Sequence, residues 1–181
     1  ELKVIGNDIY YTAESDCSNE NTNDLNLYKN KVQITDNDGI DKQEIPTSLA
    51  SVNDTLFYTS NSGIYMLDGD TPKLSLENNK IAGNLQLAAT DDGIRAVWSQ
   101  TSDMGTEFYT SELVNGAWSE PVAITDYGKL VRQLSIANYG GKLFGAYNIT
   151  DRTEQDGSIV NGSTNLCSQP LITLSSPLYL P

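Results

Sequence analysis

The stretch EFYTSELVNGAWSEPVAIT, residues 107–125, gives the clearest structural signal in this chain of 181 residues. Two runs suited to strands, 108–111 and 118–124, flank Asn115 and Gly116. Asn-Gly is a pair that a tight hairpin turn favours, because both turn residues accept positive φ. The stretch therefore predicts a β-hairpin.

The rest of the chain carries the same kind of signal. Short runs rich in Val, Ile, Leu, Tyr and Thr alternate with clusters of Gly, Pro, Asn and Asp. Such runs between turn residues are typical of strands, and no stretch shows the spacing of an amphipathic helix. We therefore expect an all-β chain.

The predicted strands repeat along the sequence. A unit of strand, tight turn and strand occurs four times, with first strands at 2–4, 49–52, 85–89 and 134–137. The second strands share an aromatic residue at one common position, namely Tyr11, Tyr58, Trp98 and Tyr147. Their spacing is about 40 to 50 residues, a period that indicates a repeat architecture.

A hairpin follows each unit. The stretch 107–125 is the third of these hairpins, and the fourth is expected to pair 158–160 with 171–174. WSEPVAIT in the third copy is echoed by CSQPLITL in the fourth, which aligns Cys167 with Trp118. Each copy then has four short antiparallel strands, and the copies occupy residues 1–46, 47–80, 81–128 and 129–176.

The second strand of each copy is apolar at consecutive positions, as in 9–11 and 56–58. This pattern predicts burial on both faces of the sheet. Strand number, length and period together predict a β-propeller of four-stranded antiparallel blades. Four blades make a small ring, so we expect part of a larger propeller, with further blades from sequence outside this chain. A closed four-bladed ring of the hemopexin type and a β-sandwich are the alternatives.

Two stretches resemble known propeller repeats. YGGKLFGAYN, residues 139–148, resembles the glycine-pair strand of kelch repeats, and YTSELVNGAWSEPVAIT, residues 109–125, resembles two strands of sialidase-type (Asp-box) and TolB-like blades. In the Asp-box pattern Ser/Thr-x-Asp-x-Gly-x-x-Trp/Phe, this hairpin keeps Ser111 and Trp118 but lacks the Asp and the Gly. A complete match falls one hairpin earlier, at Thr101, Asp103, Gly105 and Phe108. The resemblance implies a bacterial β-propeller repeat protein.

The charge is strongly acidic, with 24 Asp and Glu against 11 Lys and Arg and a formal net charge of −13. Such a field repels phosphate backbones and anionic lipid, so we expect no nucleic-acid partner. No apolar run is long enough to span a bilayer, so we expect no membrane insertion. Acidic composition rich in Asn, Ser and Thr suits an extracellular or cell-surface protein, and simple solubility explains the charge equally well. Glu1 is not followed by a secretory signal, which leaves a cytosolic, a processed or an excised chain open.

Two cysteines, Cys17 and Cys167, lie near opposite ends of the sequence. Neither belongs to a CxxC or Cys/His cluster, which excludes the usual structural zinc and redox motifs. A disulfide between them would join the first copy to the fourth and would fit closure of a ring. Free thiols are the alternative.

Histidine is absent from the chain, which removes the commonest general base and the usual transition-metal ligands. Carboxylate, tyrosine and arginine chemistry remains. The sialidase resemblance implies three arginines that hold a substrate carboxylate, and the chain has three, Arg95, Arg132 and Arg152. All three belong to the last two copies, and the family's Arg-Ile-Pro-type motif is missing, so ordinary structural roles are expected.

Three acidic residues crowd together in ITDNDGID, at Asp36, Asp38 and Asp41. They are the candidate calcium ligands, and calcium is the one cofactor considered. Position 34 is Ile where an EF-hand-like loop needs an oxygen ligand, and the closing Glu is missing. Turn formation is therefore the alternative, because Ile-Thr-Asp recurs at 124–126.

Aromatic residues are the remaining resource for binding. Tyr127 and Tyr139 lie in or beside predicted turns and, with Trp98, are the candidate contacts to a glycan or a protein partner. Packing in the core is the alternative for each. We expect a non-enzymatic binding or adhesion module that uses loops at the propeller face. A sialidase-like glycoside hydrolase and a structural assembly subunit are the competing hypotheses.

Overall fold

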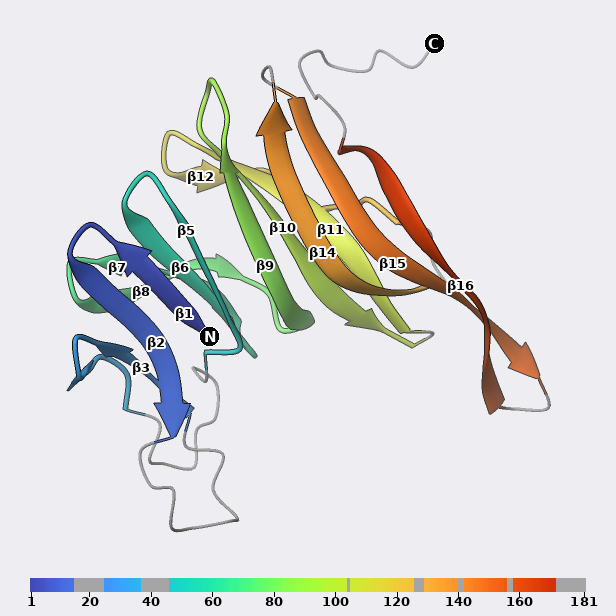
Figure 1. The fold of residues 1–181 in the computed structure, drawn as a ribbon, viewed down its shortest axis with the longest axis horizontal. Helices are drawn as coiled ribbons and strands as arrows, with labels where there is room; N and C mark the ends of the chain where they lie inside the picture. The colour runs from blue at the N-terminus through green and yellow to red at the C-terminus, as the bar shows by residue number, and fades with distance from the viewer. Residues whose placement is uncertain are drawn as a thin grey trace.

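The computed structural model describes residues 1–14, 25–36, 46–103, 105–125, 129–139, 142–155 and 158–171. Regular secondary structure in these residues is entirely β, which confirms the predicted all-β class. Figure 1 shows the strands gathered into sheets that stand side by side in a row. In the described ranges, no helix is long and apolar enough to cross a membrane.

The first two sheets each contain four antiparallel strands in sequence order. The first sheet consists of β1 (Leu2–Ile5), β2 (Asp8–Glu14), β3 (Leu25–Lys29) and β4 (Val32–Gln33). The second consists of β5 (Ser48–Val52), β6 (Thr55–Ser60), β7 (Gly63–Asp68) and β8 (Thr71–Glu77). Asn53 and Asp54, with φ of 49° and 57°, form the turn between β5 and β6. Positive φ at both positions is the geometry of a type I′ turn, which Asn and Asp tolerate.

The third sheet contains the hairpin predicted from residues 107–125. Its strands are β9 (Ile81–Ala89), β10 (Ile94–Ser102), β11 (Gly105–Val114) and an outer strand in two pieces, β12 (Ala117–Trp118) and β13 (Val122–Ala123). Asn115 and Gly116 adopt φ of 52° and 81° in the turn between β11 and β12. Both outer pieces pair antiparallel with β11, so the hairpin is confirmed.

The fourth sheet differs from the predicted copy. It contains three long strands, β14 (Lys129–Tyr139), β15 (Lys142–Gln155) and β16 (Ser158–Leu171). The prediction that 158–160 pairs with 171–174 is wrong, because 158–160 pairs with 153–155 at the start of one continuous strand. Residues 172–174 lie outside the described part. A single parallel bridge, from Thr106 to Leu130, pairs β14 with β11, so the third and fourth sheets are the two parts of one eight-stranded sheet.

The predicted equivalence of Cys167 and Trp118 is also wrong. Cys167 lies in the third strand of its sheet, where its backbone pairs with Tyr147. Trp118 lies in the fourth strand of its sheet, where it pairs with Leu113. The similarity of the two sequence stretches therefore does not reflect equivalent places in the fold.

The hydrophobic core is divided into clusters that lie between neighbouring sheets. Between the first and second sheets are Tyr10, Leu27, Leu49, Leu56, Tyr58, Tyr65 and Leu67. In β6, Tyr58 joins this cluster while Phe57 joins the next one, between the second and third sheets. In β10, Trp98 faces the second sheet and Val97 packs with residues of the fourth. The second strands β6 and β10 are therefore buried on both faces, as predicted. The same prediction is wrong for 9–11 in β2, because Tyr10 is buried against the second sheet while Ile9, on the other face, is 44% exposed.

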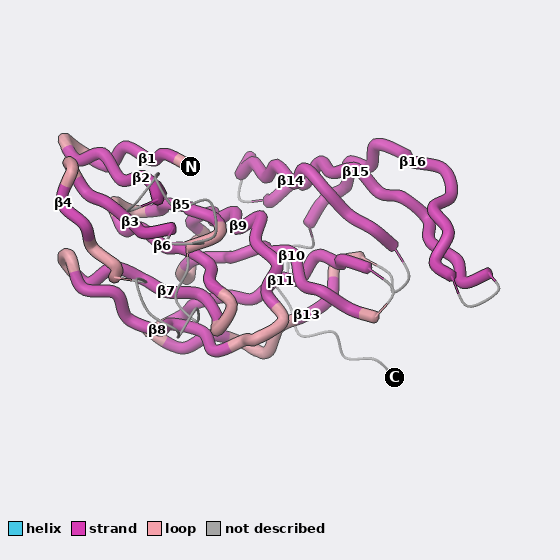
Figure 2. Tube along the Cα trace, turned by 90° about the horizontal axis from the view of Figure 1, so that it is seen from below, coloured by secondary structure: helices cyan, strands magenta, loops and turns pink. Residues whose placement is uncertain are grey.

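The first strands of the four sheets lie next to one another along the row: β1 beside β5, β5 beside β9, and β9 beside β14. Figures 1 and 2 show the first and fourth sheets at opposite ends. The described residues thus form an open row of sheets packed face to face.

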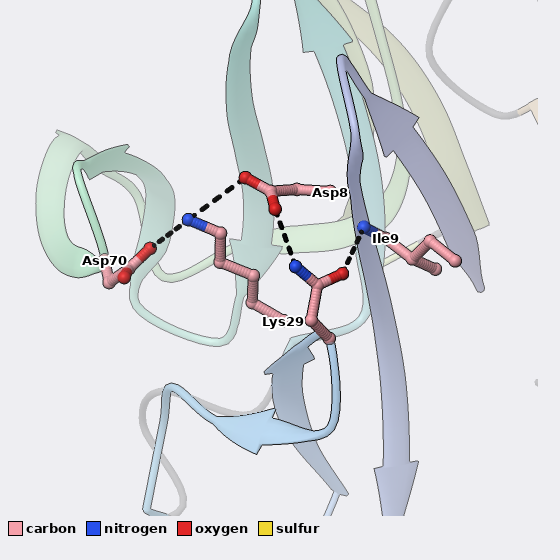
Figure 3. A network of polar contacts seen from close by, with 5 residues as sticks. Asp8, Ile9, Lys29 and Asp70 are labelled. Atoms are coloured by element: carbon pink, nitrogen blue, oxygen red, sulfur yellow. Dashed lines mark hydrogen bonds and ion pairs between the residues drawn. The ribbon is translucent and has the colours of Figure 1, made fainter.

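A polar network joins the first and second sheets at the edge of the row (Figure 3). The Lys29 ammonium lies 3.2 Å from a carboxylate oxygen of Asp8 and 2.8 Å from one of Asp70, so it bridges two sheets. Hydrogen bonds from Asn30 and Lys29 lower the pKa of the Asp8 carboxyl. The hydrogen bonds to Asp70 and Asp8 raise the pKa of Lys29 well above its ordinary value.

Candidate functional site

The aromatic candidates do not form a site in the described part of the chain. Trp98 is fully buried, and its Nε1 donates a hydrogen bond to Gln100 Oε1 at 3.2 Å. No surface of the indole is exposed to a ligand, so Trp98 is a core residue in this structure. Tyr139 ends β14, where its backbone pairs with Lys142. Tyr127 lies outside the described residues.

The acidic candidates are only partly described. Asp36 follows β4 and is exposed, while Asp38 and Asp41 lie outside the described residues, as does Cys17. Within the ranges that the structure describes, no three Cys, Asp or Glu side chains lie close enough together to hold a metal ion. The structure therefore adds no support for a calcium site.

The three arginines are separated by the fold. Arg95 is buried, and its guanidinium lies 2.9 Å from the carboxylate of Glu112. It lies at the start of β10, toward the edge of the sheets that carries the turn at 115–116. Arg132 lies near the start of β14 and Arg152 in the late part of β15, and these parts of the two strands pair, so both arginines lie toward the opposite edge from Arg95. The described geometry does not bring the three arginines together.

Two adjoining cavities lie along the other edge of the sheets, which is the lower edge in Figure 1. One, of about 470 Å³, is lined by residues around the turn between β10 and β11, together with Lys80. The other, of about 550 Å³, is lined by Asn61, Ser62 and residues 77–79. The link between β8 and β9 contributes to both, so we call the two cavities together the lower-edge groove.

The strand register places the polar groups of the first cavity. Gln100 pairs with Glu107, and Trp98 pairs with Tyr109, between β10 and β11. Side chains two residues apart on a strand share a face. All four therefore lie on the face of the third sheet that packs against the second. Trp98 is deep in that interface, Tyr109 is partly buried, and Gln100 and Glu107 follow toward the lower edge.

Hydrogen bonds fix these polar side chains. Ser102 Oγ donates to Glu107 Oε1 at 2.7 Å, and the Glu107 side chain is only 3% exposed. Gln100 Oε1 accepts from Asn78 Nδ2 at 2.8 Å and from the Trp98 indole. Asn78 belongs to the link between the second and third sheets, so the Gln100 amide ties the edges of two sheets together. The groove is thus held in shape before any ligand is present.

The link and the turn are also joined through their backbones. Thr101 N donates to Lys80 O at 2.8 Å, and Asn78 N donates to Ser62 O at 2.8 Å. The Lys80 N–H donates to Asn78 Oδ1 at 3.0 Å. These bonds run along the groove floor from the second sheet to the third. They pair backbone N–H and C=O groups of the link between β8 and β9, which would destabilise the fold if partly buried without a partner.

The complete Asp-box pattern lies at this groove. Its Thr101 and Asp103 line the cavity, and its last residue, Phe108, is buried in the core with 1% exposure. The pattern therefore lies across the turn between β10 and β11, with polar residues at the edge and the aromatic residue inside.

Among the described residues, the groove offers carboxylate and hydroxyl oxygens, amide groups, the ammonium group of Lys80 and the aromatic ring of Tyr109. Glu107 and Ser102 are inside, while Lys80 and Asp103 are exposed at the rim. Such a set suits a ligand rich in hydroxyl groups, because the amides and oxygens donate and accept hydrogen bonds and the ring offers an apolar face.

Comparison with known protein families and with curated proteins gives no match for this chain. The groove residues Asn78, Gln100 and Tyr109 were missed as candidates in the sequence. One signal could have found them. The second and fourth strands of consecutive sheets end at the same edge. Residues 78–80, after the fourth strand of the second sheet, and residues 101–103, at the end of the second strand of the third sheet, are therefore expected to lie close together.

Proposed function

We propose that this chain is a propeller-type binding module that recognises a neutral glycan in the lower-edge groove, outside the cell or at its surface. The supporting observation is the lining of the groove. Its described walls are amide, hydroxyl and carboxyl side chains together with the ring of Tyr109, and hydrogen bonds between the third sheet and its link to the second hold them in place. A ligand rich in hydroxyl groups satisfies these donors and acceptors when water is displaced.

Neutrality of the glycan follows from charge. The chain carries a formal net charge of −13, and Glu107 and Asp103 line the groove. A carboxylated or sulfated sugar would meet like charge there and would be repelled. The ring of Tyr109 offers an apolar face on which a sugar ring can stack while the polar groups orient its hydroxyls.

The propeller part of the proposal rests on how the sheets pack. Neighbouring sheets, of which the first two are four-stranded, are packed face to face, with their first strands side by side. In a propeller the first strands surround a central axis and loops at one face carry the ligand site. Sheets that cover the two ends of the row would complete the ring.

A glycan array followed by isothermal titration calorimetry tests the binding. We expect Tyr109→Ala to weaken affinity for the best glycan at least tenfold, which is about 1.4 kcal/mol. Two variants at exposed aspartates distinguish a loss of binding in the groove from a general effect of removing a surface charge. Asp103→Ala changes an exposed residue of the groove, and Asp91→Ala changes an exposed turn residue at the opposite edge. Unchanged affinity in Tyr109→Ala and Asp103→Ala, or no glycan bound at all, would contradict the proposal.

A glycoside hydrolase is the second candidate, and one observation favours it. Glu107 and Tyr109 line the same cavity, and a tyrosine paired with an acid is the nucleophile that the sialidase resemblance implies. Release of 4-methylumbelliferone from a panel of glycosides would reveal turnover. Turnover that disappears in Glu107→Gln would replace the binding proposal with the enzyme.

A further inference from the structure

One face of the first sheet is apolar and uncovered among the described residues. Leu2 and Val4 are each 61% exposed, and Ile9 is 44% exposed. The register pairs Leu2 with Tyr11, Val4 with Ile9, and Tyr11 with Tyr28, so all five side chains share one side of the sheet. We call this set the open face of the first sheet.

The second sheet has the same face in a covered state. There Leu49 pairs with Tyr58, and Tyr58 pairs with Tyr65, in the register of Leu2, Tyr11 and Tyr28. The tyrosine rings stack in both sheets: the centroids are 5.4 Å apart for Tyr11 and Tyr28 and 5.1 Å for Tyr58 and Tyr65, with 10° between planes in each case. The two faces are therefore the same structure repeated.

The two faces differ in whether another sheet packs over them. Leu49 is 1% exposed and Tyr58 is 0% exposed, because the first sheet lies over them with Tyr10 and Leu27. The structure thus shows what this kind of face binds. It binds the opposite face of another sheet of the same type.

Such an opposite face is uncovered by described residues on the fourth sheet. In β15, Tyr147 points toward the third sheet, so Phe144 and Ala146 point away from it. Phe144 is 40% exposed, and its neighbour across β14, Ala137, is exposed as well. We call Ala137, Phe144 and Ala146 the open face of the fourth sheet.

The two open faces are at opposite ends of the row (Figure 1). The second and third sheets lie between them, so one copy does not bring them together without rearrangement. We propose that the open face of the first sheet docks the open face of the fourth sheet of a second copy of this chain. The contact is head-to-tail, and it repeats the packing that already joins the first sheet to the second.

Head-to-tail contacts are heterologous, and they form a ring if the rotation closes and a filament if it does not. Each copy carries a formal net charge of −13, so repulsion opposes the contact at low ionic strength. At 0.1 M salt, the repulsion between exposed charges more than about 10 Å apart is largely screened. Association is therefore expected to strengthen as salt is raised, which is the reverse of a contact held by ion pairs.

Sedimentation velocity over a wide concentration range tests the proposal with a matched pair of variants. Val4→Lys places a charge on the open face of the first sheet. Val32→Lys places the same charge in the same sheet, at 64% exposure against 61% for Val4, but away from that face. We expect Val4→Lys to weaken self-association at least tenfold and Val32→Lys to leave it unchanged. A wild type that stays monomeric at all concentrations and salts overturns the proposal.

Mixing two variants identifies the partner face. Val4→Lys retains the open face of the fourth sheet, and Phe144→Lys retains that of the first, so each alone is expected to stay monomeric at concentrations where the wild type associates. Their mixture is expected to form a one-to-one dimer through the one intact contact. Dimers of Phe144→Lys alone would show that two first sheets bind each other, which overturns the head-to-tail contact. Circular dichroism of each variant shows that it is folded. Glycan affinity is independent of these variants, because none of them lies in the lower-edge groove.

Discussion

The first and second sheets carry the same face with opposite exposure. Leu2 and Leu49 hold the same place in the register, yet one is 61% exposed and the other 1%. Backbone pairing and tyrosine stacking are alike in the two sheets. The side-chain pattern therefore makes a surface suitable for burial, and the neighbouring sheet decides whether the surface is buried. The free energy of unfolding should therefore depend on whether a neighbouring sheet covers the residue that is changed.

Truncation of the leucine pair should give the largest difference. Leu49→Ala is expected to lower the free energy of unfolding by about 2 to 5 kcal/mol, because it leaves a cavity between two sheets. Leu2→Ala should change it by no more than about 0.5 kcal/mol, as for other surface substitutions. Urea unfolding at low protein concentration measures both. Equal losses in the two variants would mean that the open face is covered within one copy.

Removal of a tyrosine hydroxyl should give a smaller difference. The Tyr65 hydroxyl lies 2.9 Å from Ser62 Oγ, in a side chain only 7% exposed. Tyr65→Phe is expected to cost about 1 kcal/mol, the usual net value of such a bond. The Tyr28 hydroxyl has only a long bond, 3.3 Å to Gln33 Oε1, at an exposed site.

Tyr28→Phe should therefore leave the free energy of unfolding almost unchanged. The same urea experiment provides the comparison, and near-ultraviolet circular dichroism checks that the ring stack survives in both variants. A loss in Tyr28→Phe as large as that in Tyr65→Phe would contradict the assignment of Tyr28 to an uncovered face.

The smallest effect concerns pH at the network between these two sheets. Asn30 and then Lys29 lower the pKa of Asp8 below its ordinary value of 3.8. A depressed carboxyl pKa adds stability above the unfolded pKa, and that stability is lost as pH falls through the folded pKa. The melting temperature should therefore fall on acidification below about pH 4. Asp8→Asn should make that decrease in melting temperature smaller. Asp91→Asn, at an exposed turn, is the control, and an identical reduction there would count against the network.

Local sequence signals predicted three sheets well. Asn115 and Gly116 fix a turn through their own φ preferences, and the adjacent strands are then held in register. Phe57 and Tyr58 are both apolar, and burial on opposite faces follows from the two-residue period of a strand. In each case neighbouring residues carry the decisive information.

The fourth sheet could not be predicted in this way. Asn161-Gly162 is a local turn signal, but it continues as strand because β16 pairs with β15 along most of its length. Pairing over many residues outweighs a preference of two residues. The similarity of WSEPVAIT and CSQPLITL does not indicate equivalent positions for the same reason. The pairing of β16 with β15 determines where Cys167 lies.

The candidate site was the least predictable part. Trp98 was a candidate because it is a large aromatic residue, but its place in the register buries it between two sheets. Gln100, two residues further, reaches the edge and meets Asn78 from the link between the second and third sheets. The alternation of side-chain direction along one strand can be predicted from the sequence. Which residues of two sheet edges lie together depends on how the sheets pack.

The division of the core between neighbouring sheets has a consequence for cooperativity. In a linear array, the free energy of unfolding is approximately a sum over the units and the interfaces between nearest neighbours. The second and third sheets each take part in two of the buried clusters, and the first and fourth in one each. Loss of an end sheet therefore removes one interface, while loss of an inner sheet removes two. Fraying should begin at the ends of the row, and the lower-edge groove lies between the two sheets that open last.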